Sequence, residues 1–140
     1  MRIMAIDYGD TRTGLAISDA TGTLAGDAWI LVEKNPERLA QTIKETARER
    51  RVETLILGLP KNMDGTEGAR AEKSRIFAEL LAAAGTPEVI LWDERRTTVS
   101  ADAILKDVGK RGKKKKQVLD AVAASLILEG YLSSLRQGNR

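Results

Sequence analysis

The sequence predicts an α/β domain in which helices cover both faces of a mixed five-stranded sheet. Five short apolar runs, each bounded by turn residues, are typical of buried strands. The first three runs are joined by short connections, which favour an antiparallel meander. Segments with an apolar stripe at helical spacing separate the last runs, and right-handed crossovers of this kind make the first, fourth and fifth strands parallel.

The antiparallel part of the sheet is expected at the start of the chain. Ile3–Ile6 form the first strand, which leads directly into Asp7. Gly14–Ser18 form the second strand, and after a turn at residues 19–22 the third strand covers Ala25–Val32. Asp7 therefore ends a strand that is buried on both faces, where an unpaired charge is costly in free energy.

The first helix has a clear start and a clear buried face. Asn35 is the predicted N-cap and Pro36 the first helical residue. One apolar stripe is expected to face the sheet, formed by Leu39, Ala40, Ile43 and Ala47. The fourth strand follows at Thr54–Leu57, and Gly58 is expected to begin the loop after it.

A polar loop at residues 61–66 leads into the second helix, which is predicted from about Glu67 to Ala84. Gly85 provides the C-terminal stop of this helix. Its buried stripe is expected to include Ala69, Ile76, Phe77, Leu80 and Leu81.

The last part of the chain supplies a fifth strand and two further helices. The strand covers Val89–Trp92 and delivers Asp93 and Glu94. A short helix at residues 99–108 and a basic loop precede the last helix, which is expected to end near Leu135. No internal repeat and no linker divides the sequence, so residues 1–140 are predicted to form a single domain.

The composition is that of an ordinary soluble globular protein. Hydrophobic residues make up 42% and charged residues 31% of the chain, within the usual range for this class. No run reaches the ~18 apolar residues that a membrane helix needs. Asp7 interrupts the N-terminal apolar stretch, so we expect no signal peptide, no membrane partner and a cytoplasmic location.

The chain contains no cysteine and no histidine. These absences exclude disulfides, thiolate nucleophiles, Cys/His zinc sites and Ser-His-Asp triads. An enzyme of this composition must use carboxylates, lysines, hydroxyls and metal ions. Carboxylate ligands favour hard cations such as Mg²⁺ or Mn²⁺.

Basic residues cluster ahead of the last helix, although the net charge of the chain is only +3. Seven basic side chains lie between Lys106 and Lys116, and only Asp107 opposes them. Such a cluster favours a polyanionic partner, and a solvated loop is the alternative interpretation. Aromatic residues make up only 4% of the chain, so broad recognition of bases by stacking is not expected.

Three acids are expected at one edge of the sheet, because the carboxyl ends of parallel strands meet there. Asp7 ends the first strand, Glu94 follows the fifth, and Asp120 lies on the apolar stripe of the last helix. Each acid also has a purely local interpretation. Asp7 suits a turn, Glu94 suits a surface pair with arginine, and Asp120 suits a helix N-terminus.

Converging carboxylates repel one another unless divalent cations neutralise them. Two such ions about 3.5–4 Å apart can activate water and stabilise the leaving oxygen in phosphodiester cleavage. Gly9 and Gly14 permit close backbone approach in the same region. The basic side chains expected to neutralise backbone phosphates are Arg12, Lys61, Arg95, Lys113, Lys114, Lys115 and Lys116.

With these residues assembled, the chain resembles the YqgF-type family over essentially its whole length. The motifs that carry the resemblance are Asp7-Tyr8-Gly9 with Arg12-Thr13-Gly14, Gly58-Leu59-Pro60 with Asn62–Thr66, Asp93-Glu94-Arg95 with Thr97-Thr98, and Asp120 with Ala123, Ala124 and Ile127. Thr13 departs from the family pattern, in which an aliphatic residue is expected, and this departure concerns local packing.

Members of this family are described as pre-16S ribosomal RNA nucleases or Holliday-junction resolvases with an RNase H-like fold. The resemblance implies that Asp7, Glu94 and Asp120 are metal-binding catalytic acids, with two Mg²⁺ or Mn²⁺ ions as cofactors. The supporting positions are Gly9, Gly14, Gly58, Thr97 and Thr98.

Trimming of the 5′ end of a ribosomal RNA precursor is the leading hypothesis for the function. Resolution of branched DNA is the second, and its two coordinated cuts require a dimer, so both a monomer and a homodimer stay open. The first loop also looks like the phosphate loop of sugar kinases and actin-like ATPases, but 140 residues leave no room for their second domain. A non-catalytic RNA-binding module is the remaining alternative.

Overall fold

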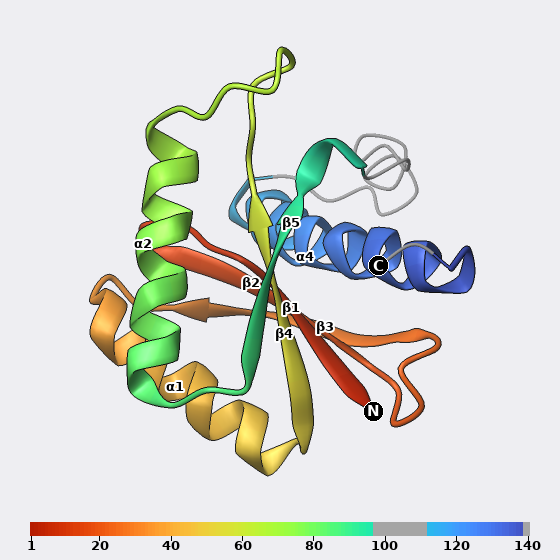
Figure 1. Cartoon of the computed structure of the whole chain (residues 1–140). Coiled ribbons are helices and arrows are strands. Elements are labelled where there is room, and N and C mark those ends of the chain that lie inside the picture. Colours follow the sequence, from red (N-terminus) through yellow and green to blue (C-terminus); the bar gives the residue numbers. More distant parts are fainter. Residues whose placement is uncertain (97–111, 139–140) are drawn as a thin grey trace.

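A computed structural model describes the backbone of residues 1–96 and 112–138 and the side chains of residues 1–96 and 121–138. Five strands form one sheet in the order β3-β2-β1-β4-β5 (Figure 1). The strands are β1 (Arg2–Asp7), β2 (Arg12–Ser18), β3 (Ala25–Val32), β4 (Val52–Leu59) and β5 (Glu88–Asp93). The helices are α1 (Pro36–Glu49), α2 (Ala69–Ala84) and α4 (Gly112–Arg136), and a 3₁₀ turn covers Glu94–Arg96.

The predicted strand directions are confirmed. β1 pairs antiparallel with β2, and β2 pairs antiparallel with β3. β1 and β5 both pair with β4 in parallel. Because these three parallel strands end at one edge of the sheet, the residues that follow them lie near one another although they are far apart in the sequence.

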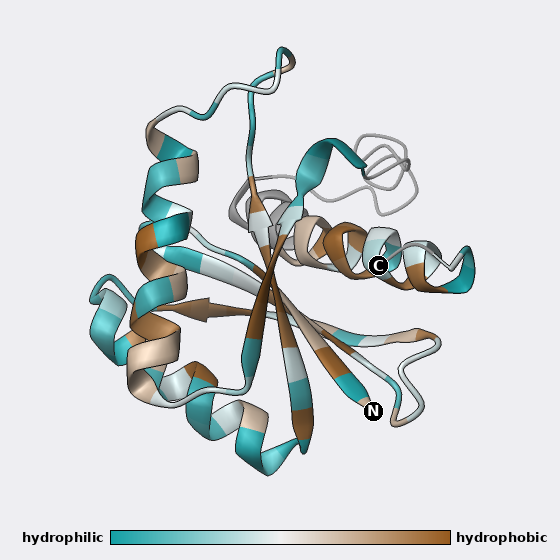
Figure 2. Cartoon of the chain, in the orientation of Figure 1, coloured by the Kyte–Doolittle hydropathy of each residue, from teal (hydrophilic) through white to brown (hydrophobic). Residues whose placement is uncertain are grey.

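Two hydrophobic cores, one on each face of the sheet, hold this arrangement together. α1 and α2 cover one face and bury Leu39 and Phe77 against Leu55 of β4. α4 covers the other face and packs Ile127 against residues that include Ile56 of β4. Figure 2 shows hydrophobic residues along the middle of the central strands. Helices therefore cover both faces, as predicted.

α1 forms as its sequence predicts. The Asn35 side chain accepts a hydrogen bond from the backbone N–H of Arg38 at 3.0 Å, and Pro36 opens the helix. All four residues of the predicted stripe are buried. The predicted stop of α2 is also confirmed, because Gly85 adopts the left-handed conformation with φ +89°.

α2 buries only part of the predicted stripe: Phe77 and Leu81 are buried as predicted, and Leu80 is partly buried. Ile76, which was expected inside, is 51% exposed, and Ala69 is exposed as well. The buried residues are Ala71, Ser74, Phe77 and Leu81. Ala71 is fully buried, and Phe77 stacks on Tyr8 with ring centroids 4.2 Å apart. These two features set the rotation of the helix and leave Ile76 outside.

The last helix starts earlier than predicted. α4 begins at Gly112, so the basic stretch at residues 113–116, expected in a loop, is helical. Lysine is a good helix former, and no glycine or proline occurs between Gly112 and Gly130. The short helix predicted at residues 99–108 lies outside the described residues.

In the part of the chain that the structure describes, no helix is both long and apolar enough to cross a membrane.

Candidate active site

Asp7 and Glu94 lie at the same edge of the sheet. Asp7 is the last residue of β1, and Glu94 follows directly after β5. Ile3 and Ala5 of β1 pack in the core under α4. Because side chains alternate along a strand, Asp7 faces the same side of the sheet as these two residues. Trp92, two residues before Glu94, belongs to this core as well.

Two glycines flank Asp7 on the neighbouring strands. Gly14 of β2 is the direct partner of Asp7 in the antiparallel ladder. On the other side, β4 pairs Leu57 with Ile6, and the next residue of β4 is Gly58. Neither flanking position carries a side chain, so the neighbouring strands place only backbone beside Asp7.

The backbone of Gly58 also lies directly against Glu94. A Cβ atom at Gly58 would lie 3.1 Å from the carboxyl carbon of Glu94 and 2.6 Å from Cδ1 of Ile127 in α4. Gly58 was expected to begin a loop, but the structure places it inside β4, opposite Trp92 of β5. Its role is therefore to let the Glu94 carboxyl group and α4 approach the sheet.

Replacing Gly58 by alanine is expected to destabilise the fold by about 1–3 kcal/mol, the usual cost of overpacking a core. The added methyl group would push Ile127 and Glu94 away from the sheet. Urea denaturation measures this loss. Gly68→Ala is the matched control, because the nearest atom to a Cβ at Gly68 is 4.0 Å away. Equal stability of the two variants would contradict the close approach seen at Gly58.

Glu94 carries a charge in a poorly hydrated position. Burial raises the pKa of the Glu94 carboxyl, the nearby positive charge of Arg70 opposes this shift, and the negative charge of Asp93 adds to it. Among the described residues, none donates a hydrogen bond or forms an ion pair with this carboxylate. A half-buried carboxylate of this kind is stabilised when a cation binds beside it.

The residues at this edge fit a hard divalent cation. Asp7 ends β1 and Glu94 follows β5 at one edge of the sheet, and oxygen ligands of this kind suit Mg²⁺ or Mn²⁺. Position 120 belongs to α4, one helical turn before Ala124, which is fully buried against the sheet. The side chain of Asp120 lies outside the described ones, and among the described side chains no group of three acids forms a metal cluster.

The structure of the loop after Asp7 explains why position 13 is a threonine, where the family pattern has an aliphatic residue. Thr13 is fully buried, and its hydroxyl oxygen accepts the N–H of Gly9 at 3.3 Å and lies 3.4 Å from the Gly9 carbonyl oxygen. A Cβ atom at Gly9 would collide with the carbonyl oxygen of Arg12. The Thr13 hydroxyl group thus stabilises a tight turn by hydrogen bonding to the backbone of Gly9. An aliphatic side chain at this position could not form that hydrogen bond.

Arg70, a residue not singled out in the sequence, fixes the same loop to α2. Its guanidinium group donates to the carbonyl oxygen of Tyr8 at 2.8 Å and lies 3.5 Å from the Asp10 carboxylate. Lys73 pairs with Asp10 at 3.1 Å. An arginine in the first turn of a helix is unfavourable for the helix dipole. That mismatch is the signal in the sequence that could have identified Arg70.

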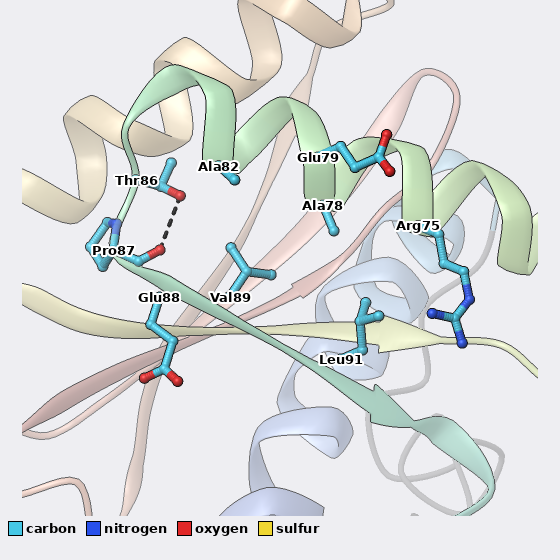
Figure 3. Close-up of a pocket in the computed structure, with 9 residues that line it drawn as sticks. All are labelled: Arg75, Ala78, Glu79, Ala82, Thr86, Pro87, Glu88, Val89 and Leu91. Atoms are coloured by element: carbon cyan, nitrogen blue, oxygen red, sulfur yellow. Dashed lines mark hydrogen bonds between the residues drawn. The ribbon is translucent and has the colours of Figure 1, made fainter.

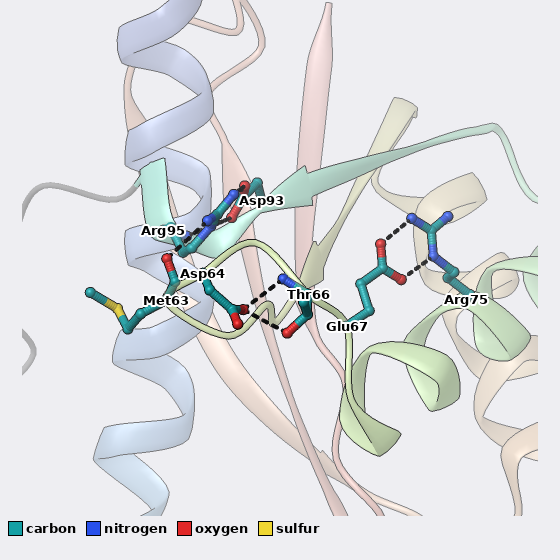
Figure 4. Close-up of polar contacts among 7 residues, drawn as sticks. All are labelled: Met63, Asp64, Thr66, Glu67, Arg75, Asp93 and Arg95. Carbon is teal, nitrogen blue, oxygen red and sulfur yellow. Dashed lines mark hydrogen bonds and ion pairs between the residues drawn. The ribbon is translucent and has the colours of Figure 1, made fainter.

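Arg95, predicted to bind phosphate, makes several contacts within the protein (Figure 4). Its Nη2 atom lies 2.7 Å from the Asp93 carboxylate and its Nε atom 3.1 Å from both carboxylate oxygens. Its Nη1 atom donates to the carbonyl oxygen of Met63 at 3.4 Å. The hydrogen bonds from Arg95 hold the pKa of Asp93 below its usual range. Arg95 therefore links β5 to the loop after β4, a contact that competes with phosphate binding.

The other predicted phosphate contacts are only partly described. Arg12 opens β2 next to the Asp7 loop, and Lys61 forms an isolated β-bridge with Glu67. Thr97 and Thr98 lie outside the described residues, as do the side chains of Lys113, Lys114, Lys115 and Lys116.

A cavity of about 500 Å³ lies elsewhere, between α2 and β5 (Figure 3). Its lining includes Arg75, Glu79, Val89 and Leu91. Val89 and Leu91 pack with the core under α1 and α2, on the face of the sheet opposite Asp7. This cavity is therefore separate from the acidic edge.

Comparisons with known proteins show which family this chain resembles in sequence. The model of the RuvX family, described as Holliday junction resolvase, matches residues 1–134. A protein of Halothermothrix orenii named "Putative pre-16S rRNA nuclease" is 47% identical over 133 residues, which cover 95% of each chain. A protein of Acetivibrio thermocellus with the same name is 47% identical and covers 96% of each chain.

A solved structure supports the fold. "T. thermophilus RuvC in complex with Holliday junction substrate" superposes with a TM-score of 0.63 at 16% identity, over 99% of this chain and 96% of that one. The similarity confirms the predicted RNase H-like architecture of the sheet and its helices.

Proposed function

This chain belongs to the RuvX family, and from that premise we propose that it is a metal-dependent nuclease that hydrolyses phosphodiester bonds in precursor 16S rRNA. The observation that carries the RNA assignment is the name shared by relatives that match nearly the whole chain. Such a substrate would place the protein in ribosome biogenesis and in the cytoplasm.

Asp7, Glu94 and Asp120 are the proposed metal ligands and catalytic acids. When bound, Mg²⁺ or Mn²⁺ would activate water as the nucleophile and stabilise the charge that develops on the leaving oxygen. The ends of β1 and β5 hold two of the acids on one face, and α4 carries the third. Gly14 and Gly58 add no side chain next to Asp7, and the missing side chain at Gly58 lets Glu94 approach the sheet.

The polynucleotide backbone is proposed to lie along the basic side chains of Arg12, Lys61 and the lysines at residues 113–116. Contacts of this kind neutralise phosphates and are weakened by salt. Arg70 and Arg95 have different proposed tasks, because both are engaged by protein groups at the rim of the site. Arg70 positions the loop after Asp7, and Arg95 positions the loop after β4.

Cleavage of branched DNA is the second candidate. The family description and the fold of a resolvase bound to a junction both favour it. Resolution of a four-way junction needs two coordinated cuts, so this function requires a homodimer with two active sites.

Product mapping separates the two candidates. Purified protein is incubated with a precursor rRNA fragment and with a four-way junction, each with Mg²⁺, with Mn²⁺ and with a chelator. We expect metal-dependent cleavage of the RNA at defined 5′ positions. Cleavage of the junction alone would assign the enzyme to DNA, and cleavage of both in the presence of chelator would refute the metal mechanism.

A further inference from the structure

The loop after β4 contains a tightly hydrogen-bonded turn at residues 61–67, here called the Met63 turn. Asn62 and Thr66 are joined by a backbone hydrogen bond of 2.9 Å, and the N–H of Gly65 donates to the carbonyl oxygen of Asn62 at 2.9 Å. The Asp64 carboxylate accepts the backbone N–H and the hydroxyl of Thr66 at 2.9 and 2.6 Å. The turn thus has its own internal support and does not depend on the Met63 side chain.

Contacts on both sides fix the Met63 turn at the rim of the candidate active site (Figure 4). On one side, Arg95, the residue after Glu94, donates to the carbonyl oxygen of Met63 at 3.4 Å. On the other side, Glu67 forms a bidentate ion pair with Arg75 of α2, with distances of 2.6 and 2.7 Å. The turn therefore keeps a defined position relative to Glu94.

The Met63 side chain is 92% exposed, more than any other large hydrophobic side chain in the described part of the chain. In Figure 4 it points away from every other residue drawn. A fixed turn that presents an apolar side chain to water gains nothing for folding from that side chain. The free energy of burying it is available only when a partner covers it.

We propose that Met63 is a wedge that inserts between adjacent bases next to the scissile phosphodiester bond, an inference that rests on the proposed nuclease function. Methionine is among the apolar side chains that enter base steps and unstack them, and its polarisable thioether packs well against aromatic rings. Unstacking at this point would bend the strand so that its backbone approaches Asp7 and Glu94. Aromatic residues, which could also stack on bases, make up only 4% of the chain, and the exposed apolar side chain at this turn is a methionine.

The fluorescence of 2-aminopurine, which rises when the base is unstacked, tests the wedge. The probe is placed beside the mapped cleavage site or, where no cut is found, at the branch point of the junction and at the mature 5′ end of the precursor RNA. Binding is measured with Asp7→Asn protein, so that substrate stays intact. We expect a fluorescence increase on binding that Met63→Ser removes and Met63→Leu largely restores.

Cleavage rates supply the second measurement. In the otherwise native protein, Met63→Ser is expected to lower kcat about tenfold while Kd changes by less than about threefold, because a wedge acts on the bound substrate. Leu24→Ser is the matched control, since Leu24 is also exposed but lies in the turn between β2 and β3. It is expected to leave both quantities unchanged.

The outcomes of this test are distinct. If the protein cuts its substrate and Met63→Ser equals wild type in fluorescence and kcat, the wedge is refuted and the nuclease function stands. If nothing is cut but Met63-dependent unstacking is seen, the nuclease function fails and the placement of the wedge beside a scissile bond fails with it, although Met63 still unstacks bases. If no nucleic acid binds, both are refuted.

Discussion

Replacing Asp7 by asparagine is expected to reduce phosphodiester cleavage at least about a thousandfold, which corresponds to about 4 kcal/mol of activation free energy. The amide keeps the shape of the side chain but removes the negative charge that would bind a divalent cation between Gly14 and Gly58. Single-turnover cleavage assays with Mg²⁺ and with Mn²⁺ measure the effect. The melting temperature of the variant shows whether the fold is retained.

Asp27→Asn is the matched control for this experiment. It makes the same chemical change on β3, where Asp27 is exposed and pairs with Arg50 at 3.6 Å. We expect it to cleave at the wild-type rate. An Asp7→Asn protein that is folded and fully active would refute the proposed role of Asp7 and, with it, the metal mechanism.

Replacing Glu94 by glutamine is expected to have two opposite effects: cleavage falls by a similar factor of about a thousand, while the metal-free protein becomes more stable. The folded-state pKa of Glu94 is raised above its unfolded value, chiefly by burial. The wild-type protein therefore loses stability as the pH rises from the unfolded pKa through the folded pKa, and it stays less stable above that range. The glutamine side chain has no charge to bury.

Urea denaturation in the presence of chelator tests the second effect. The stability gain of Glu94→Gln should be small below about pH 4, where both forms are neutral, and should grow toward neutral pH. Glu53→Gln, at an exposed position near the start of β4, serves as control. A gain that does not depend on pH would show that packing, rather than charge, limits stability at Glu94.

Most of the architecture could be predicted because it depends on local patterns. Apolar runs, short turns and the cap at Asn35 define strands and α1, and the handedness of crossovers then determines the sheet order. The buried face of α2 could not be predicted in the same way. Its rotation depends on the stacking of Phe77 on Tyr8, a contact between residues far apart in the sequence. The spacing of apolar residues correctly placed Phe77 and Leu81 inside but wrongly placed Ile76 there.

For the candidate active site, too, the features set by strand direction could be predicted, and those set by tertiary contacts could not. The convergence of Asp7 and Glu94 follows from the directions of β1 and β5, whereas the surroundings of these acids follow from tertiary contacts. Gly58 was expected in a loop because glycine is common there, yet its role depends on the approach of Ile127 from α4. The pairing of Arg95 with Asp93 depends on the 3₁₀ turn after β5, for which the sequence has no distinct signal.

The packing of α4 has a consequence for protein synthesis. Among the described residues, α4 supplies the helical side of the second core, including Ala124, Ile127 and Leu132, and it also carries position 120. A chain still emerging from the ribosome would therefore lack both the cover of that face and the third proposed ligand. Cleavage activity would begin only once translation of the last helix is nearly complete, so a truncated product would be an inactive one.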